Sequence, residues 1–287
     1  MSSPKIIECP RDAMQGIKTF IPTPEKVSYL QSLLDVGFDT LDFGSFVSPR
    51  AVPQMQDTEA VLNDLDLSKT NTRLLAIVAN LRGAQKACSL KKIDFLGYPF
   101  SISENFQMRN THKTISESLT VLERILELTR LHNKSLVVYL SMGFGNPYGD
   151  PWSVDIVGSW TETLAKMGVK IVSLSDTVGT ARNNDISYLF SKLITQFPDL
   201  EFGAHFHTHP KQWFEKVDAA FNAGCLRFDG AVQGYGGCPM AKDDLTGNMP
   251  TEKLINYFSE KQLSTGLNLA HFESAYNKAT QVFSSYK

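Results

Sequence analysis

Residues 114–141 read TISESLTVLERILELTRLHNKSLVVYLS, and this stretch contains the signal of a helix followed by that of a strand. In its first part, apolar side chains recur every three or four residues, which is the period of a helix with one buried face. These side chains are Ile115, Leu119, Leu122, Ile125, Leu126 and Leu128. Its last part, 135–141, is a short apolar run typical of a buried strand. The stretch is therefore predicted to be one helix-strand unit of an α/β fold.

The same alternation continues along the whole chain. Eight segments are predicted as strands: 4–9, 38–43, 72–79, 92–97, 135–141, 169–174, 200–206 and 226–231. Helices are predicted near 25–36, 57–65, 114–132, 151–167, 183–197 and 210–223, and Gly37, Gly168 and Gly224 stand where three helices should end. Eight such units without a linker favour a closed (β/α)8 TIM barrel, as a single domain over residues 1–287. The segment after residue 250 continues the helical pattern, and a stretch at 268–284 is predicted as a C-terminal helical extension.

The composition excludes several classes of protein. Of the 287 residues, 42% are hydrophobic, which is enough for a large core, and the net charge of −2 gives no basic surface for nucleic acid. No segment approaches the ~20 apolar residues of a membrane span, and the early first strand leaves no room for a signal or transit peptide. The four cysteines form no Cys-x-x-Cys pair, so we expect reduced thiols and a cytoplasmic location.

Polar side chains follow several of the predicted strands. In (β/α)8 barrels, the carboxyl ends of the strands form the mouth that holds the active site. Here those ends carry Arg11-Asp12, Asp42, Ser175-Asp176, His205 with His207, and the glycine-rich segment 234–239. The sequence therefore predicts that these groups gather at one mouth.

His205 and His207 are the sharpest local feature. Alternate residues of a strand face the same side, so the two imidazoles can bind one ion. The simpler alternative is that the two histidines are polar strand-end residues that bind nothing. Asp12 favours metal binding, however, because it ends the first strand, which lies near the seventh in a closed barrel. Nitrogen and oxygen ligands suit Mg²⁺, Mn²⁺, Zn²⁺ or Fe²⁺, and an amide ligand such as Asn248 would favour the harder ions.

Arg11 and Cys238 each allow a structural and a catalytic interpretation. Arg11 could form a surface ion pair with Asp12, or its guanidinium could hold a carbonyl or enolate oxygen that gains negative charge in a transition state. Cys238 could be a small buried hydrophobe. A glycine-rich loop is a poor place to bury a side chain, however, which favours a reactive thiol that donates a proton.

Several longer motifs resemble those of the 3-hydroxy-3-methylglutaryl-CoA lyases, within the wider group of metal-dependent barrel lyases and acyl-CoA condensing enzymes. The similarity runs from about residue 6 to residue 270 and keeps the order of the family's motifs. The motifs are Pro10-Arg11-Asp12-Ala13-Met14-Gln15, Ser45-Phe46-Val47-Ser48-Pro49-Arg50 with Val52-Pro53-Gln54-Met55, Asn146-Pro147-Tyr148, Ser173-Leu174-Ser175-Asp176-Thr177-Val178-Gly179, and Gly236-Gly237-Cys238-Pro239 with Gly247-Asn248.

The resemblance implies cleavage of 3-hydroxy-3-methylglutaryl-CoA, or of a related 3-hydroxyacyl-CoA, to acetyl-CoA and acetoacetate, as in leucine degradation. It implies a divalent cation, Mg²⁺ or Mn²⁺ before Zn²⁺, held by Asp12, His205, His207 and Asn248. Arg11 would hold the thioester oxygen, and Asp12 or His205 would act as the base. Cys238 would complete the site, and Asp176 would bond to the metal-bound water or the substrate hydroxyl. Lys18, Asp42, Ser48 and Arg50 would bind the acyl-CoA substrate.

The chain also departs from the family pattern. Where the family has Asp-Thr-Tyr-Gly after its His-x-His, this chain has Thr208-His209-Pro210-Lys211, so a carboxylate is lost and an imidazole is gained. Because outer-shell groups tune the ligands, metal affinity or preference could differ. Asp42 replaces a glutamate, and Ala13 replaces a glycine. These changes suggest a divergent branch with a different 3-hydroxyacyl-CoA substrate.

Two alternatives to the lyase remain open from the sequence. An acyl-CoA condensing synthase or a 2-oxo-acid aldolase would use the same scaffold and metal site, although the 45–55 motif and the Cys238 loop favour the lyase. A catalytically retired metal-binding or CoA-binding protein is the second alternative, supported by the loss of the carboxylate after His207. The expected partner is a small acyl-CoA substrate, with no nucleic acid or membrane, and a homodimer is the assembly to test.

Overall fold

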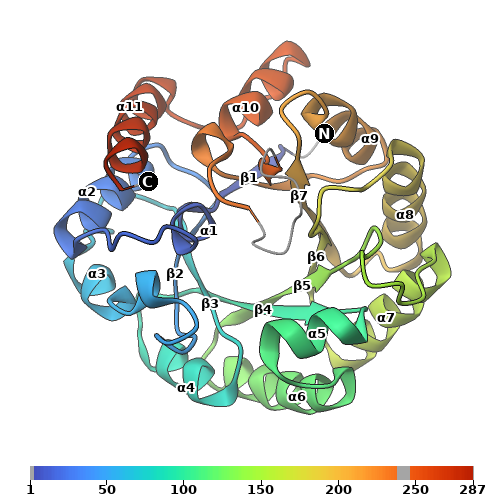
Figure 1. The fold of residues 1–287 in the computed structure, drawn as a ribbon. Helices are drawn as coiled ribbons and strands as arrows, with labels where there is room; N and C mark the ends of the chain where they lie inside the picture. The colour runs from blue at the N-terminus through green and yellow to red at the C-terminus, as the bar shows by residue number, and fades with distance from the viewer. Residues whose placement is uncertain (1–2, 238–245, 287) are drawn as a thin grey trace.

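The computed structural model describes residues 3–237 and 246–286, and eight parallel strands in it close into a barrel (Figure 1). The strands are β1 (Lys5–Glu8), β2 (Thr40–Ser45), β3 (Arg73–Ile77), β4 (Phe95–Ser101), β5 (Ser135–Ser141), β6 (Ile171–Asp176), β7 (Glu201–Thr208) and β8 (Arg227–Gly230). Each strand pairs with the next along the chain, and β8 pairs with β1 to complete the ring. The predicted (β/α)8 barrel and all eight predicted strands are confirmed.

The helices of the described residues form a ring around the barrel, and the short helix α1 lies inside that ring (Figure 1). They are α1 (Pro10–Gln15), α2 (Thr23–Leu34), α3 (Thr58–Asp64), α4 (Leu81–Ser89), α5 (Glu104–Thr111), α6 (Ile115–Leu131), α7 (Val154–Met167), α8 (Asn183–Gln196), α9 (Trp213–Asn222), α10 (Thr251–Glu260) and α11 (Leu269–Ser285), with short 3-10 turns at η1 (Pro53–Met55) and η2 (Val232–Gly234). Among the described residues, no helix is both long enough and apolar enough to cross a lipid bilayer.

Three of these helices, α1, α4 and α5, are absent from the sequence prediction. Helix α4 buries Gly83, Ala84, Ala87 and Cys88, and such small side chains leave no strong apolar period to detect. Polar caps start α4 and α5, because the side chains of Asn80 and Ser103 accept hydrogen bonds from backbone amides of the first turn. Helix α1 has only six residues, so its period cannot be recognised in sequence.

Helix α6 shows why a long helix was predictable from the sequence. Thr114 and Glu117 form a capping box, in which each side chain accepts a hydrogen bond from the backbone amide of the other residue. Its apolar stripe is buried against the barrel at Ile115, Leu122, Ile125 and Leu126. The predicted helix ends are also confirmed, since Gly37, Gly168 and Gly224 all have positive φ angles.

The C-terminal extension is helix α11, which packs beside α2 (Figure 1). Phe283 of α11 meets the ring of Tyr29 edge-on, with 5.9 Å between centroids, and stacks on Tyr235 at 4.1 Å. Tyr235 belongs to the segment that follows β8. Helix α11 therefore supports both the outer layer and one side of the loop that leads back to the barrel mouth.

Candidate functional site

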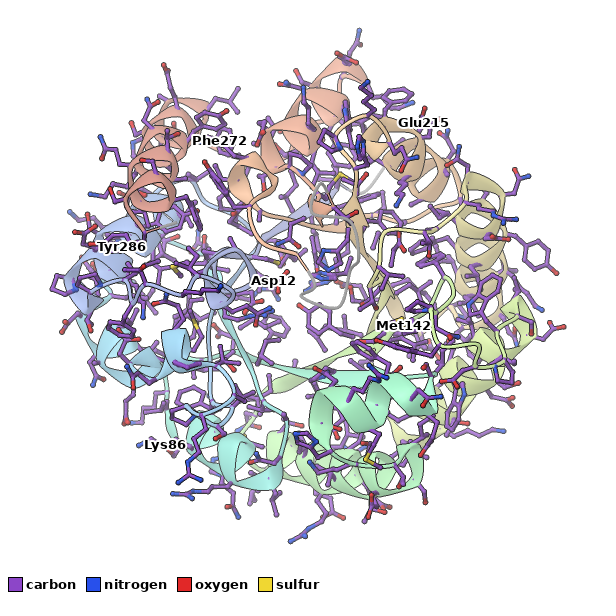
Figure 2. The ribbon with its side chains drawn as sticks, viewed as in Figure 1. Asp12, Lys86, Met142, Glu215, Phe272 and Tyr286 are labelled. Carbon is purple, nitrogen blue, oxygen red and sulfur yellow. The ribbon has the colours of Figure 1, made fainter. Side chains whose placement is uncertain are left out.

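Helix α1 fixes Arg11 and Asp12 at the carboxyl end of β1. Pro10 occupies the first helical position, and one helical turn then brings Gln15 next to both preceding side chains. Arg11 Nη1 donates to Asp12 Oδ1 at 3.0 Å and to Gln15 Oε1 at 2.8 Å, and Gln15 Nε2 donates to Asp12 Oδ1. The prediction placed Arg11 and Asp12 at the end of a strand, whereas they lie in the first turn of a short helix. Figure 2 shows Asp12 inside the ring of helices.

Asp42 of β2 holds the other side of the Arg11 guanidinium. Its carboxylate accepts from Nη2 at 2.6 Å and from Nε at 3.0 Å, and its side chain is fully buried. Burial raises the pKa of Asp42 to about 6 even though Arg11 opposes the shift. An arginine has five N–H groups, and four of them are used by Asp42, Asp12 and Gln15. Within the described residues, one N–H of Nη2 remains for a further oxygen atom.

Asp12, His205 and His207 converge at this mouth. One ligand atom from each lies within 4.8 Å of the others, which fits a single cation. Burial would raise the pKa of Asp12, but Arg11 and the two histidines lower it below its ordinary value. Burial lowers the pKa of His207 to about 4, with a smaller contribution from His205. A carboxylate and a neutral imidazole are the forms that bind metal ions.

Two buried atoms of this cluster, Asp12 Oδ2 and His207 Nδ1, have no hydrogen-bond partner among the described residues. Unpartnered buried polar atoms are rare and usually meet water or an ion. Asn248 adds an amide beside them, because the short strand β9 (Gly247–Asn248) pairs antiparallel with β7 and sets Asn248 opposite His207. Asn248 Nδ2 donates to the Tyr235 carbonyl at 2.8 Å, and hydrogen bonding from the same side chain contributes to the lowered pKa of Asp12, so the amide lies beside the carboxylate. The residues present therefore fit a divalent metal ion.

Asp229 is a site residue that sequence reasoning missed. Its Oδ2 lies 3.0 Å from His205 Nδ1, and its side chain is 1% exposed. The contact follows from the register, because Asp229 of β8 stands directly beside His205 of β7. Burial lowers the pKa of His205, but Asp229 more than offsets this and raises it overall. A carboxylate on the far ring nitrogen orients a metal-binding histidine. Alternate side chains of a strand face opposite sides, and this alternation along 226–231 could have indicated that Asp229 points into the barrel.

Lys216 is the second residue that was missed. It lies in α9 and is 2% exposed, and its Nζ reaches Asp176 Oδ2 at 2.6 Å, the Gly179 carbonyl at 2.9 Å and the His207 carbonyl at 3.0 Å. The Asp176 carboxylate also accepts hydrogen bonds from the backbone amides of residues 180 and 181. Asp176 thus lies in a closed network that ties β6, its following loop and β7 together.

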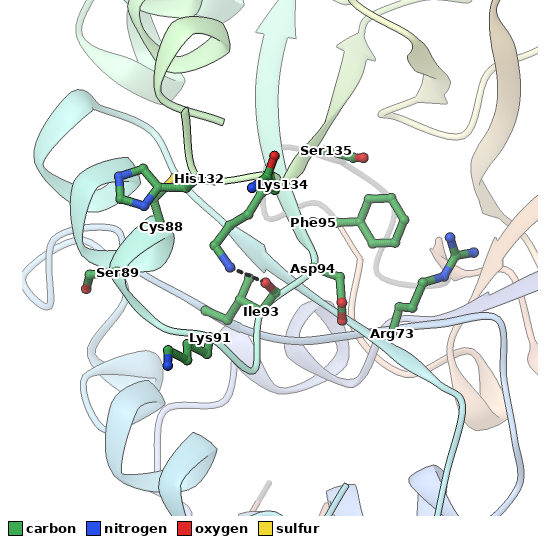
Figure 3. Close-up of a pocket in the computed structure, with 11 residues that line it drawn as sticks. Arg73, Cys88, Ser89, Lys91, Ile93, Asp94, Phe95, His132, Lys134 and Ser135 are labelled. Carbon is green, nitrogen blue, oxygen red and sulfur yellow. Dashed lines mark hydrogen bonds between the residues drawn. The ribbon is translucent and has the colours of Figure 1, made fainter. Parts of the chain in front are cut away.

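The remaining predicted residues lie apart from this cluster. Lys18, Ser48 and Arg50 are exposed on the loops that follow α1 and β2. Cys238 lies outside the described residues. Figure 3 shows a cavity of about 690 Å³ at the opposite end of the barrel, where Arg73, Phe95 and Ser135 begin their strands. It shares no residue with the metal-type cluster, so the candidate site is the mouth and not this cavity.

Comparison with known proteins identifies the family of the chain. The HMGL-like family model matches residues 4–278. The hydroxymethylglutaryl-CoA lyase YngG of Bacillus subtilis is 30% identical over 93% of this chain and 88% of its own length. The cytoplasmic 3-hydroxy-3-methylglutaryl-CoA lyase of Rattus norvegicus is 31% identical over 92% of this chain and 77% of its own length.

Solved structures of HMG-CoA lyases resemble this chain over nearly its whole length. The HMG-CoA lyase of Bacillus subtilis superimposes with a TM-score of 0.91 at 28% identity and covers 98% of this chain and 94% of its own. The HMG-CoA lyase of Acinetobacter baumannii, solved in complex with coenzyme A and 3-methylmalate, gives a TM-score of 0.90 at 28% identity, over 98% of this chain and 91% of its own.

Proposed function

The chain belongs to the HMGL-like family, and from this premise we propose that it is a metal-dependent lyase that cleaves 3-hydroxy-3-methylglutaryl-CoA, or a related 3-hydroxyacyl-CoA, to acetyl-CoA and acetoacetate. One observation carries the proposal. The metal-type cluster of Asp12, His205 and His207 lies directly beside Arg11, whose guanidinium keeps one free N–H among the described contacts. A cation-binding group and an oxyanion-binding group thus share one mouth.

Asp12, His205, His207 and Asn248 would hold the cation, for which we propose Mg²⁺ or Mn²⁺. When bound, a divalent cation lowers the pKa of a hydroxyl group that it contacts. The donor set supports this assignment, since it offers carboxylate and amide oxygens with two imidazole nitrogens.

Asp12 and His205 are the two candidate bases. Asp229 holds His205 Nδ1 and raises its pKa, but the cation would occupy Nε2, so a metal-bound His205 has no lone pair left for a proton. Asp12 keeps a free lone pair when one of its oxygens binds the cation, although Arg11 and the histidines lower its pKa. In the proposed reaction, a carboxylate oxygen of Asp12 accepts the proton of the 3-hydroxyl group. The C2–C3 bond then breaks, and its electron pair moves to the acetyl-CoA enolate while acetoacetate forms.

Arg11 would stabilise the enolate oxygen through its remaining N–H. Asp42 and Gln15 fix the guanidinium before the substrate arrives, so no reorganisation is needed as negative charge develops. Asp42 is fully buried, and we infer that it acts on the substrate through Arg11. Cys238 is the proposed acid that protonates the enolate at C2. Lys18, Ser48 and Arg50 are exposed on the loops that follow α1 and β2 and are proposed to contact the CoA portion.

The location and assembly are part of the same proposal. Cys9, Cys88 and Cys225 are free buried thiols, which supports a reducing compartment such as the cytoplasm. A role in leucine degradation would follow from the substrate, and a homodimer remains the assembly to test by light scattering.

The test is cleavage of 3-hydroxy-3-methylglutaryl-CoA by the purified protein with Mg²⁺ or Mn²⁺, followed as acetoacetate released. We expect His205→Ala, which removes a proposed metal ligand, and Cys238→Ala, which removes the proposed acid, to lower kcat by on the order of 10² to 10⁴. His271→Ala is the matched control, because His271 is exposed on α11 and should leave the rate unchanged. A wild-type protein that binds Mn²⁺ but cleaves no compound in a panel of 3-hydroxyacyl-CoAs would refute the proposal.

A further inference from the structure

A second group of possible ligand atoms lies beside the first. Cys9 Sγ, a ring nitrogen of His205 and a carboxylate oxygen of Asp229 all lie within 4.8 Å of one another. Cys9 directly follows β1, and β1 pairs with β8, which carries Asp229. The thiol is 1% exposed and has only one weak contact, 3.8 Å to the Ile7 carbonyl. The three possible ligand atoms are therefore already close together, and the Cys9 sulfur has no strong contact to give up when it binds an ion.

Two further buried atoms belong to the same region. Asp229 Oδ1 and the Tyr139 hydroxyl have no hydrogen-bond partner among the described residues. The Tyr139 ring lies edge-on to His205, with 5.3 Å between centroids. Burial raises the pKa of Tyr139 first, and the charges of Asp229 and then Cys9 raise it further, which places the phenol near both groups. Buried polar atoms are rarely left unpaired, so this region calls for a bound ion or water.

The surrounding charge favours a cation over a neutral guest. Asp12, Asp42 and Asp229 all lie close enough to raise the pKa of Cys9, although burial contributes most. Arg11 is bonded to Asp12 and Asp42, and the arginine nearest in charge to Asp229 is the buried Arg227, whose Nη1 pairs with Glu201. Among the described residues, Asp229 forms no ion pair with a lysine or an arginine. A set of sulfur, nitrogen and oxygen ligands selects borderline and soft ions such as Zn²⁺ and Co²⁺, and it suits Mg²⁺ poorly.

We propose that Cys9, His205 and Asp229 form a second, inner cation site for a borderline divalent ion such as Zn²⁺ or Co²⁺, and that this site competes with the outer site for His205. The competition follows from the two ring nitrogens. The outer site needs Nε2 as a free ligand, so the proton sits on Nδ1 and is donated to Asp229. The inner site needs Nδ1 as the ligand, so that proton must move to Nε2.

One imidazole therefore serves one site at a time. On inner-site binding, Nδ1 gives its proton to Nε2 through solvent, and the Cys9 thiol releases its own proton to the buffer as the sulfur–metal bond forms. No electron is transferred, and one proton is released per ion bound. The part of the proposal that concerns inhibition rests on the proposed lyase function, but the binding site itself does not.

The test uses Co²⁺, because a cobalt–thiolate bond produces a charge-transfer absorption band in the near ultraviolet that nitrogen and oxygen ligands do not. The titration is done in a Cys238→Ala background, so that residue 238 cannot supply the thiolate. We expect a band that saturates at one Co²⁺ per chain. Cys9→Ala should abolish it, and Cys9→Ser serves as a second variant that preserves the side-chain volume. Cys225→Ala is the matched control, because Cys225 is another buried free thiol at the start of β8.

The same variants separate this inference from the proposed function. With Mg²⁺ in excess, added Zn²⁺ should inhibit the otherwise wild-type chain. Cys9→Ala should weaken that inhibition by about tenfold or more, because losing a ligand should cost at least as much as losing an outer-shell partner. A missing cobalt band, or a band that survives in both Cys9 variants, overturns the inner site whether or not the protein is a lyase. An inactive protein with the band present would refute only the lyase assignment.

Discussion

Replacing Lys216 by methionine should weaken metal binding at His207 in addition to destabilising the fold. Lys216 Nζ has three hydrogens, and the structure uses all of them, on Asp176 and on the carbonyls of Gly179 and His207. The His207 bond matters most, because it fixes the backbone of a proposed metal ligand from the side of α9.

The magnitude follows from the burial of the pair. Lys216 and Asp176 have side-chain exposures of 3% and 1%, so removing one partner strands the other in the interior. Breaking such a pair costs roughly 3–5 kcal/mol of folding free energy. Adding Asp176→Asn removes the stranded charge, yet the two carbonyls still lack their donor. We therefore expect the double variant to recover part of the stability and none of the metal affinity, which should fall about 10–100-fold.

The assay combines urea unfolding in a chelator with calorimetric titration of Mn²⁺. Lys26→Met is the matched control. Lys26 is also a buried lysine, 2.6 Å from Asp57 and bonded to the Gln54 carbonyl, but none of these groups belongs to the metal-type cluster. It should lose stability and keep its affinity for Mn²⁺. If Lys216→Met binds Mn²⁺ like the wild type, or if Lys26→Met loses the same affinity, the assignment of Lys216 as a positioning residue is wrong.

Four further outcomes are expected. Asp229→Asn should lower Mn²⁺ affinity about 10–100-fold in the same titration, because an amide cannot hold the His205 ring nitrogen as a carboxylate does. Burial raises the pKa of Glu8 from 4.5 to about 8, so the folded state holds this proton more tightly than the unfolded chain, and stability is lost as pH rises between those values. Glu8→Gln should flatten that decline in urea unfolding curves recorded from pH 5 to pH 8. Gly158→Ala in α7 should raise stability by about 0.5–1 kcal/mol, since the new methyl group meets its nearest atom at 4.0 Å. Gly83→Ala in α4 should lower the melting temperature, since its methyl group would lie 2.5 Å from a backbone carbonyl.

The fold could be predicted from the sequence because the predicted strands are short apolar runs and most helices show apolar side chains at the helical period. Residues 135–141 were predicted to the residue, and the end of the seventh strand correctly grouped His205 with His207. The sequence also predicted that the polar groups after the strands gather at one mouth, since parallel strands in a closed barrel all end on one side. Alternation and strand order were sufficient for these features.

Side-chain contacts that depend on strand register, or on which face of a helix is buried, could not be predicted from the sequence. Asp229 meets His205 only because β8 is aligned on β7 in one particular register, which no local pattern states. Lys216 sits among polar residues of a short amphipathic helix, where a lysine is normally solvent-exposed. The helix around Arg11 and Asp12 was missed because six residues are too few to show a period.

The replacement of Asp-Thr-Tyr-Gly by Thr208-His209-Pro210-Lys211 has a specific consequence in the structure. The Thr208 hydroxyl donates to the His209 carbonyl, and the His209 ring accepts from the Lys211 amide at 3.4 Å, so the new side chains bond locally. The His207 carbonyl is held by Lys216. Lys216 pairs with Asp176, and Arg11 pairs with Asp12 and Asp42, while the buried Arg227 lies near Asp229 and pairs with Glu201. Asp12 Oδ2 nevertheless has no hydrogen-bond partner among the described residues. A cation bound at the mouth would give this oxygen its partner directly, so the proposed metal site would not depend on the family's carboxylate after His207.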